Sequence, residues 1–151
     1  MFQIIGLDHI ALTVRDQERS LAWYQRVLGF ERRYEEANGA DDPVFVCAGN
    51  SCLALFPAQM SNPQSVPDGN AIAMRHFAFR LDRANFVRAQ VELREQQIPF
   101  RFEDHTMAHS IYLSDPDGHR IELTTYELSE RGEERVMQAD SSSFATEKHV
   151  L

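Results

Sequence analysis

Two histidines stand at the head of two short segments that share one pattern. His9 lies in the alternating run of residues 8–14, and His76 lies in a similar run, residues 75–81. Each run is followed by a segment with the periodicity of a helix. The repetition predicts a duplicated unit that places two imidazoles in equivalent positions.

A carboxylate near the end of the second unit completes a metal-binding set. Glu122 lies between Ile121 and Leu123 in an apolar strand pattern, and a half-buried carboxylate there needs a partner, which a metal ion would supply. Two neutral imidazoles and one carboxylate bind divalent first-row metals and leave coordination positions open. We therefore predict a mononuclear site at His9, His76 and Glu122, and the open positions indicate catalysis.

The elements that must position these residues recur in one order. The first half predicts a strand at 7–14, a helix capped by Asp16 and stopped by Gly29, and strands at 30–35, 44–47 and 52–56. The second half predicts a strand at 76–81, a helix capped by Asp82, and strands near 100–103, 110–113 and 120–125. Both halves are therefore βαβββ units.

These units divide the chain into one domain with four parts. We expect a first module over about residues 5–57, a linker over 58–73, a second module over about 74–126, and an acidic tail over 127–151 with a short helix and a loose end. The linker is rich in proline and small polar residues, so a loop over the site is an alternative for it.

Side-chain alternation assigns the candidate ligands to one face of each sheet. The apolar face carries Ile10, Leu12, Val14, Val44, Val46, Leu53, Leu55, Phe77, Phe79, Leu81, Ile111, Leu113, Ile121 and Leu123. The mixed face carries His9, Ala11, Thr13, Phe45, Cys47, Cys52, Ala54, Phe56, His76, Ala78, Arg80, Ser110, Tyr112, Glu122 and Thr124. The sequence thus predicts an α+β fold whose curled mixed sheets enclose a metal cavity, with the helices outside.

Composition and charge restrict the partners. The 151 residues carry a net charge of -8, so nucleic acid and anionic membranes are not expected partners. The expected partner is a small-molecule substrate. The sequence has no apolar run of about 20 residues and no secretory signal pattern, which predicts a cytoplasmic address. Cys47 and Cys52 could face each other across a turn at Gly49-Asn50, but in a reducing cytoplasm we expect two free thiols.

Four motifs carry a family resemblance. His9, the Trp23–Phe30 run, His76 and the Asp115–Glu122 segment resemble the vicinal oxygen chelate superfamily, over about residues 5–126. This superfamily includes glyoxalase I, fosfomycin-resistance thiol transferases, bleomycin-binding proteins, methylmalonyl-CoA epimerase and extradiol dioxygenases. The resemblance implies that His9, His76 and Glu122 are the metal ligands.

One departure from the repeat favours the superfamily members with three ligands. Ala54 stands in the first unit where Glu122 stands in the second, and alanine cannot bind a metal. A four-ligand site like that of glyoxalase I is thus disfavoured. The remaining types, extradiol dioxygenases and fosfomycin-type thiol transferases, differ in their metal: Fe(II) or Mn(II) is favoured here, with Zn or Ni as alternatives.

The residues before Glu122 resemble those of extradiol dioxygenases. A histidine, His105, precedes the Ile111-Tyr112 pair and an Asp-Pro-x-Gly turn. The resemblance implies that Tyr112 donates a hydrogen bond to a substrate oxygen and that His105 contacts the substrate. Cleavage of a small vicinal diol or catechol-like ring by oxygen is the favoured reaction.

Other sequence features keep alternatives open. Extradiol enzymes place an acid-base histidine between their two metal histidines, whereas residues 10–75 contain none. The thiol-transferase alternative lacks its threonine, replaced by Ala11, and the only lysine is Lys148. A glyoxalase-like lyase or isomerase is a further alternative. So is a non-catalytic protein that binds a small molecule, although the bleomycin-binding relatives of that kind lack the three metal ligands.

The resemblance also bears on quaternary structure. Relatives of this size commonly form homodimers, and in some of them the first module of one chain pairs with the second module of its partner. His9 would then meet His76 and Glu122 of the partner subunit, whereas pairing within one chain is the alternative.

Overall fold

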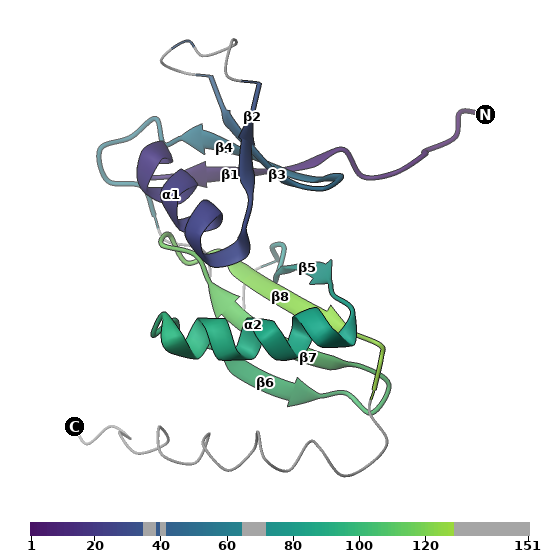
Figure 1. The fold of residues 1–151 in the computed structure, drawn as a ribbon. Coiled ribbons are helices and arrows are strands. Elements are labelled where there is room, and N and C mark those ends of the chain that lie inside the picture. Colours follow the sequence, from purple (N-terminus) through teal and green to yellow (C-terminus); the bar gives the residue numbers. More distant parts are fainter. Residues whose placement is uncertain (35–38, 40–41, 65–71, 129–151) are drawn as a thin grey trace.

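Two four-stranded sheets, each with one helix, make up the fold (Figure 1). The computed structural model describes residues 1–34, 39, 42–64 and 72–128. The first unit contains β1 (His9–Val14), α1 (Gln17–Leu28), β2 (Glu31–Arg33), β3 (Val44–Ala48) and β4 (Ser51–Pro57). The second contains β5 (Phe77–Arg80), α2 (Arg83–Glu95), β6 (Arg101–Asp104), β7 (His109–Ser114) and β8 (Arg120–Thr125). The predicted α+β class and the two βαβββ units are confirmed.

The two sheets have the same strand order. The first runs β1-β4-β3-β2 and the second runs β5-β8-β7-β6, so the opening strand of each unit lies at the edge of its sheet. The opening strand pairs parallel to the closing one in both, β1 with β4 and β5 with β8. The duplication therefore places His9 and His76 at equivalent free edges.

The core forms where the alternation predicted it. Leu12, Val14, Val46, Leu53 and Leu55 of the first sheet are buried, as are their counterparts in the second, among them Ile111, Leu113, Ile121 and Leu123. Helix α1 packs against β2, β3 and β4, while α2 packs against β8 (Figure 1). The helices thus cover the apolar faces and leave the mixed faces for a site.

Local signals at the helix ends position both helices. Asp16 and Asp82 are the N-caps, and their carboxylates accept hydrogen bonds from the backbone N–H groups of Arg19 and Asn85. Gly29 ends α1 with φ of 66°, a left-handed conformation that favours glycine. The predicted helix of the tail lies among residues 129–151, outside the described residues.

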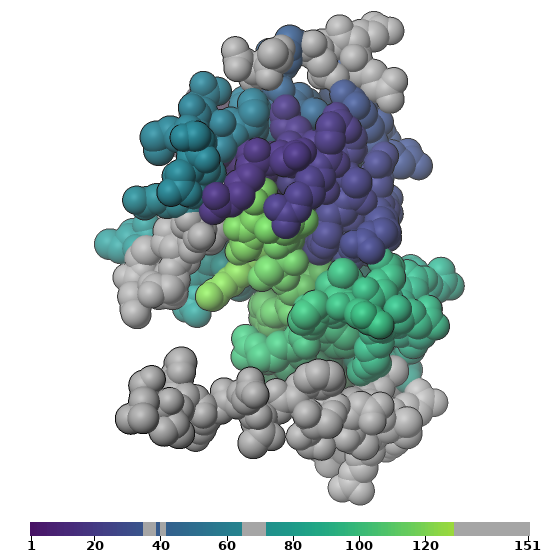
Figure 2. Space-filling view, turned by 90° about the vertical axis from the view of Figure 1, so that its left-hand side faces the viewer, coloured from purple at the N-terminus to yellow at the C-terminus, as the bar shows by residue number. Residues whose placement is uncertain are grey.

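A buried carboxylate fastens the first unit to the second. Asp115, in the turn between β7 and β8, accepts a hydrogen bond at 2.9 Å from the hydroxyl of Tyr24 on α1. It also accepts from the backbone N–H groups of Asp117 and His119, and its Oδ2 lies 2.8 Å from His119 Nδ1. The next carboxylate, that of Asp117, accepts from the N–H of Arg15 at 3.0 Å. Figure 2 shows this yellow-green part of the chain against the purple and blue atoms of the first unit.

The two sheets do not join into one. No strand pairing links them in the described part of the chain, where the Asp115 turn contacts α1 of the first unit. Within one chain α1 packs on the β7–β8 turn and β1 does not pair with β5, so the metal cavity expected between the mixed faces stays a prediction.

The two cysteines are joined. Cys47 and Cys52 are directly opposite in the β3–β4 hairpin, with their Cα atoms 4.1 Å apart and a disulfide between them. The expectation of free thiols is wrong here, since the tight Gly49-Asn50 turn brings the two backbones close at this pair. Within the part that the structure describes, no helix is long and apolar enough to cross a membrane.

Acid should weaken the junction at Asp115. Burial acts to raise the pKa of this carboxyl, but the hydrogen bonds and charge of His119 and the hydrogen bond from Tyr24 outweigh it and hold the pKa below its ordinary value. A lowered pKa stabilises the folded state above the unfolded value of about 3.9, and this contribution is lost as the pH falls through the folded value. We expect urea unfolding to show a falling free energy below about pH 4.

Removing the carboxylate tests the same junction at neutral pH. Asp115→Asn should cost about 1–3 kcal/mol at pH 7, because one of the two accepting oxygens becomes an NH2 donor and its buried partners lose their acceptor. The substitution should also flatten the acid dependence, because the amide does not titrate. Glu92→Gln, on the exposed surface of α2, is the matched control and should change neither. Equal effects of the two substitutions would contradict the assignment.

Candidate metal centre

The structure brings two of the three predicted ligands together. His76 immediately precedes β5, and Glu122 lies on the neighbouring β8, where Ala78 pairs with it. The Nε2 atom of His76 is 2.8 Å from Oε2 of Glu122. The side chain of Glu122 is 12% exposed and that of His76 is 38% exposed, so the pair opens to solvent on the histidine side.

The spacing of these donors fits a divalent ion. Two ligands at about 2.1 Å from one ion and at right angles have donor atoms about 3 Å apart. An imidazole nitrogen and a carboxylate oxygen are the donor types that first-row divalent metals accept. Without an ion, the same spacing lets a protonated His76 pair with the Glu122 carboxylate.

Ser110 orients the carboxylate from the inside of the sheet. Its fully buried hydroxyl donates to Oε1 of Glu122 at 2.6 Å, so the other carboxylate oxygen is left for His76. The same Ser110 Oγ atom is 3.1 Å from Oγ1 of Thr124. Sequence alternation placed Ser110 on the mixed face, but a small hydroxyl gave no signal of its role.

Tyr112 lies beside the pair, on the strand next to Glu122. The two residues are directly opposite in the β7–β8 register, and the Tyr112 ring centroid is 5.6 Å from that of His76. Burial, followed by the hydrogen bond and negative charge of Glu122, raises the pKa of the Tyr112 phenol. The phenol therefore remains a hydrogen-bond donor at neutral pH.

His105 reaches the same place from the turn after β6. Its Nε2 is 3.1 Å from the Tyr112 hydroxyl and 3.4 Å from a carboxylate oxygen of Glu103. The turn is closed by a hydrogen bond from the His105 N–H to the carbonyl of Ala108. The structure thus gathers His76, Glu122, Tyr112 and His105, and adds Glu103.

The third predicted ligand, His9, has other neighbours. Its Nδ1 is 2.6 Å from the carboxylate of Asp8, and its ring packs edge-on against Phe45 at 5.4 Å. Among the described residues of the single chain, no three His, Cys, Asp or Glu side chains are arranged to hold a metal. Because Asp8 contacts Nδ1, Nε2 is the nitrogen of His9 that could bind an ion. The sequence places Asp8 next to His9 but did not reveal that it orients the imidazole.

The sequence matches a known family over most of its length. A sequence model of the Glyoxalase/Bleomycin resistance protein/Dioxygenase superfamily matches residues 6–123. The family expected from the motifs is therefore confirmed.

Curated relatives include two kinds of enzyme. Catechol-2,3-dioxygenase of Bacillus subtilis (strain 168) is 32% identical over 120 residues, which are 78% of this chain and 40% of that protein. This chain thus spans less than half the length of that relative. Metallothiol transferase FosB of Staphylococcus epidermidis (strain ATCC 12228) is 28% identical over 135 residues, 87% of this chain and 89% of that protein.

Solved structures share the architecture. A glyoxalase/dioxygenase from Nostoc punctiforme superposes with a TM-score of 0.68 at 25% identity, over 81% of this chain and 91% of that one. That protein therefore shares the overall fold of this chain.

Loss of the Ser110 hydroxyl should weaken metal binding. We expect Ser110→Ala to lower the affinity for Mn²⁺ or Fe²⁺ roughly 10- to 100-fold, because an outer hydrogen bond that orients a liganding carboxylate has effects of this size. Calorimetric titration of the metal measures it. Ser114→Ala, at an exposed position of the same strand, is the control. A loss of thermal stability without a loss of metal affinity would contradict the orienting role.

Proposed function

We propose that this chain, which belongs to the Glyoxalase/Bleomycin resistance protein/Dioxygenase superfamily, is a divalent-metal-dependent enzyme that cleaves a small vicinal diol or catechol-like ring with oxygen. Members of this family are mostly metal-dependent enzymes that act on small molecules. The finer assignment rests on one observation: His76, Glu122, Tyr112 and His105 converge on one face of the second sheet.

Each of these side chains has a task in that reaction. His76 and Glu122, together with His9, would hold Fe(II) or Mn(II). The ion, when bound, would orient the two substrate oxygens and polarise them. Tyr112 keeps its proton and donates to a substrate oxygen where negative charge develops. His105 holds the phenol in place through its 3.1 Å contact and borders the substrate.

The third ligand would come from a second copy of the chain. His9 lies on the free edge strand β1, and the pair of His76 and Glu122 lies at the other free edge, β5 and its neighbour β8. Placing β1 of one copy beside β5 of another would bring the two edges together, and the symmetry of a dimer would form two such sites. The unjoined sheets of one chain support this assembly.

A second candidate function is thiol transfer to a small electrophile. The observation in its favour is the match to metallothiol transferase FosB, which extends over 89% of that protein. The match to catechol-2,3-dioxygenase covers only 40% of the length of that enzyme. Against it stands the phenol–imidazole pair of Tyr112 and His105, which supplies a donor for a diol oxygen.

A ring-cleavage assay separates the two candidates. We expect protein reconstituted anaerobically with Fe(II) to consume oxygen with 4-methylcatechol and to form a ring-opened product, followed by oxygen electrode and mass spectrometry. Tyr112→Phe should lower kcat roughly a hundredfold, since one aimed donor has that effect. Tyr126→Phe, at an exposed ring, is the control and should change kcat little. Absence of ring opening with every catechol tested, together with thiol addition to fosfomycin, would replace the proposal with the second candidate.

Mixing two inactive variants tests whether the site spans two chains. His9→Ala and Glu122→Ala should each lose tight metal binding as homodimers. In a mixed dimer one site lacks both ligands and the other is complete, so an equal refolded mixture should recover about a quarter of the wild-type metal content. Metal per chain after gel filtration measures it. If all three ligands came from one chain, no mixture would recover any.

A further inference from the structure

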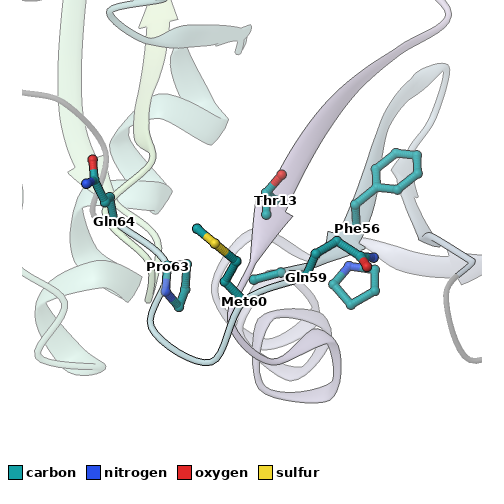
Figure 3. A pocket seen from close by; sticks show the side chains of 8 residues that line it. Thr13, Phe56, Gln59, Met60, Pro63 and Gln64 are labelled. Carbon is teal, nitrogen blue, oxygen red and sulfur yellow. The ribbon is translucent and has the colours of Figure 1, made fainter.

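A cavity of about 600 Å³ lies at the far end of the strand that begins with His9. Thr13 of β1 and Phe56 of β4 contribute to it, and the segment after β4 forms its outer wall (Figure 3). The lining consists of Thr13, Phe56, Pro57, Ala58, Gln59, Met60, Pro63 and Gln64. Its volume is typical of a pocket for a small ligand, about 300–1,000 Å³.

The cavity and His9 share one face of the first sheet. His9, Ala11 and Thr13 alternate along β1 and so point to the same side. The register pairs them with Cys52, Ala54 and Phe56 of β4. Between the histidine and the cavity, this face carries Ala11, which is exposed, and Ala54, which is fully buried and pairs with Phe45; we call these two residues the alanine track.

The length of the alanine track sets the size of a ligand that could reach from His9 to the cavity. Four residues along a strand advance about 13 Å. Ala11 is exposed, so its side of the track is open to a ligand, whereas Ala54 is fully buried beneath the surface. A molecule chelated near His9 would thus need an extension of about this length to enter the cavity.

The chemistry of the lining selects the kind of extension. None of the eight lining residues carries a charge, and Phe56, Met60 and Pro63 are apolar. A charged group in such a place would lose hydration without gaining a partner. An alkyl or aryl group would instead remove apolar surface from water, as Phe56 and Met60 are exposed at 38% and 67%.

We propose that this cavity is a specificity pocket for an uncharged, apolar substituent of the substrate, carried about 13 Å from the chelating oxygens along the alanine track. The proposal rests on the proposed function only in placing the chelating end at His9.

Binding of substituted catechols to the Zn²⁺-loaded protein under nitrogen tests the pocket without turnover. Calorimetry with 4-alkylcatechols from methyl to octyl should show affinity rising by up to about fourfold for each methylene that becomes buried, then levelling off. Affinity that does not depend on chain length would overturn the proposal.

Substitutions at Met60 locate the effect. Met60→Glu should lower the ratio of octyl to methyl affinity at least roughly tenfold, because the carboxylate would be desolvated by the chain, whereas Met60→Leu should keep that ratio within about threefold. Val91→Glu adds the same charge on α2, outside the cavity, and is the control. An equal loss of octyl and methyl affinity in Met60→Glu would overturn the proposal. Dissociation of a dimer by Met60→Glu in gel filtration would also overturn it, because a second copy of the chain would then cover this face.

The same series separates this inference from the proposed function. Chain-length-dependent binding without ring opening by the Fe(II) protein would sink the dioxygenase assignment and support the pocket. Ring opening of 4-methylcatechol, with no gain in binding affinity for longer alkyl chains, would support the dioxygenase assignment and overturn the pocket.

Discussion

The buried carboxylate of Asp115 determines how the two halves of the chain meet. With its side chain fully buried, it can remain ionised only because Tyr24, two backbone N–H groups and His119 satisfy it. Since Tyr24 belongs to α1 and Asp115 to the β7–β8 turn, this one group fastens the first unit to the second. The residues of the same turn lead directly into β8, the strand that carries Glu122.

This junction explains why the candidate centre is divided. It packs α1 against the second unit and leaves β1 and β5 as free edges, so His9 stays apart from His76 and Glu122 within one chain. Each of the two parts already has an orienting group, Ser110 behind the Glu122 carboxylate and Asp8 beside the His9 imidazole. A second copy supplying the missing edge would complete a set of donors whose outer contacts are in place.

Periodicity and caps were sufficient to predict much of this architecture. The helix from Asp16 to Gly29, the strand at 120–125 and the pairing of His76 with Glu122 follow from signals within a few residues and from the repeat. The separation of the sheets and the Cys47–Cys52 bond did not, because they depend on contacts between distant segments and on how closely a turn brings two strands. Ser110 and Asp8 were missed as positioning groups since short polar side chains reveal their partners only in three dimensions.

The metal position in crystals of the protein loaded with Mn²⁺ tests the central claim most directly. An anomalous difference map should show one peak per chain at about 2.0–2.3 Å from His76 Nε2, a carboxylate oxygen of Glu122 and Nε2 of His9 from a second copy. A map with no peak at the His76–Glu122 pair, or with a peak there whose coordination excludes His9, would contradict the three-ligand site.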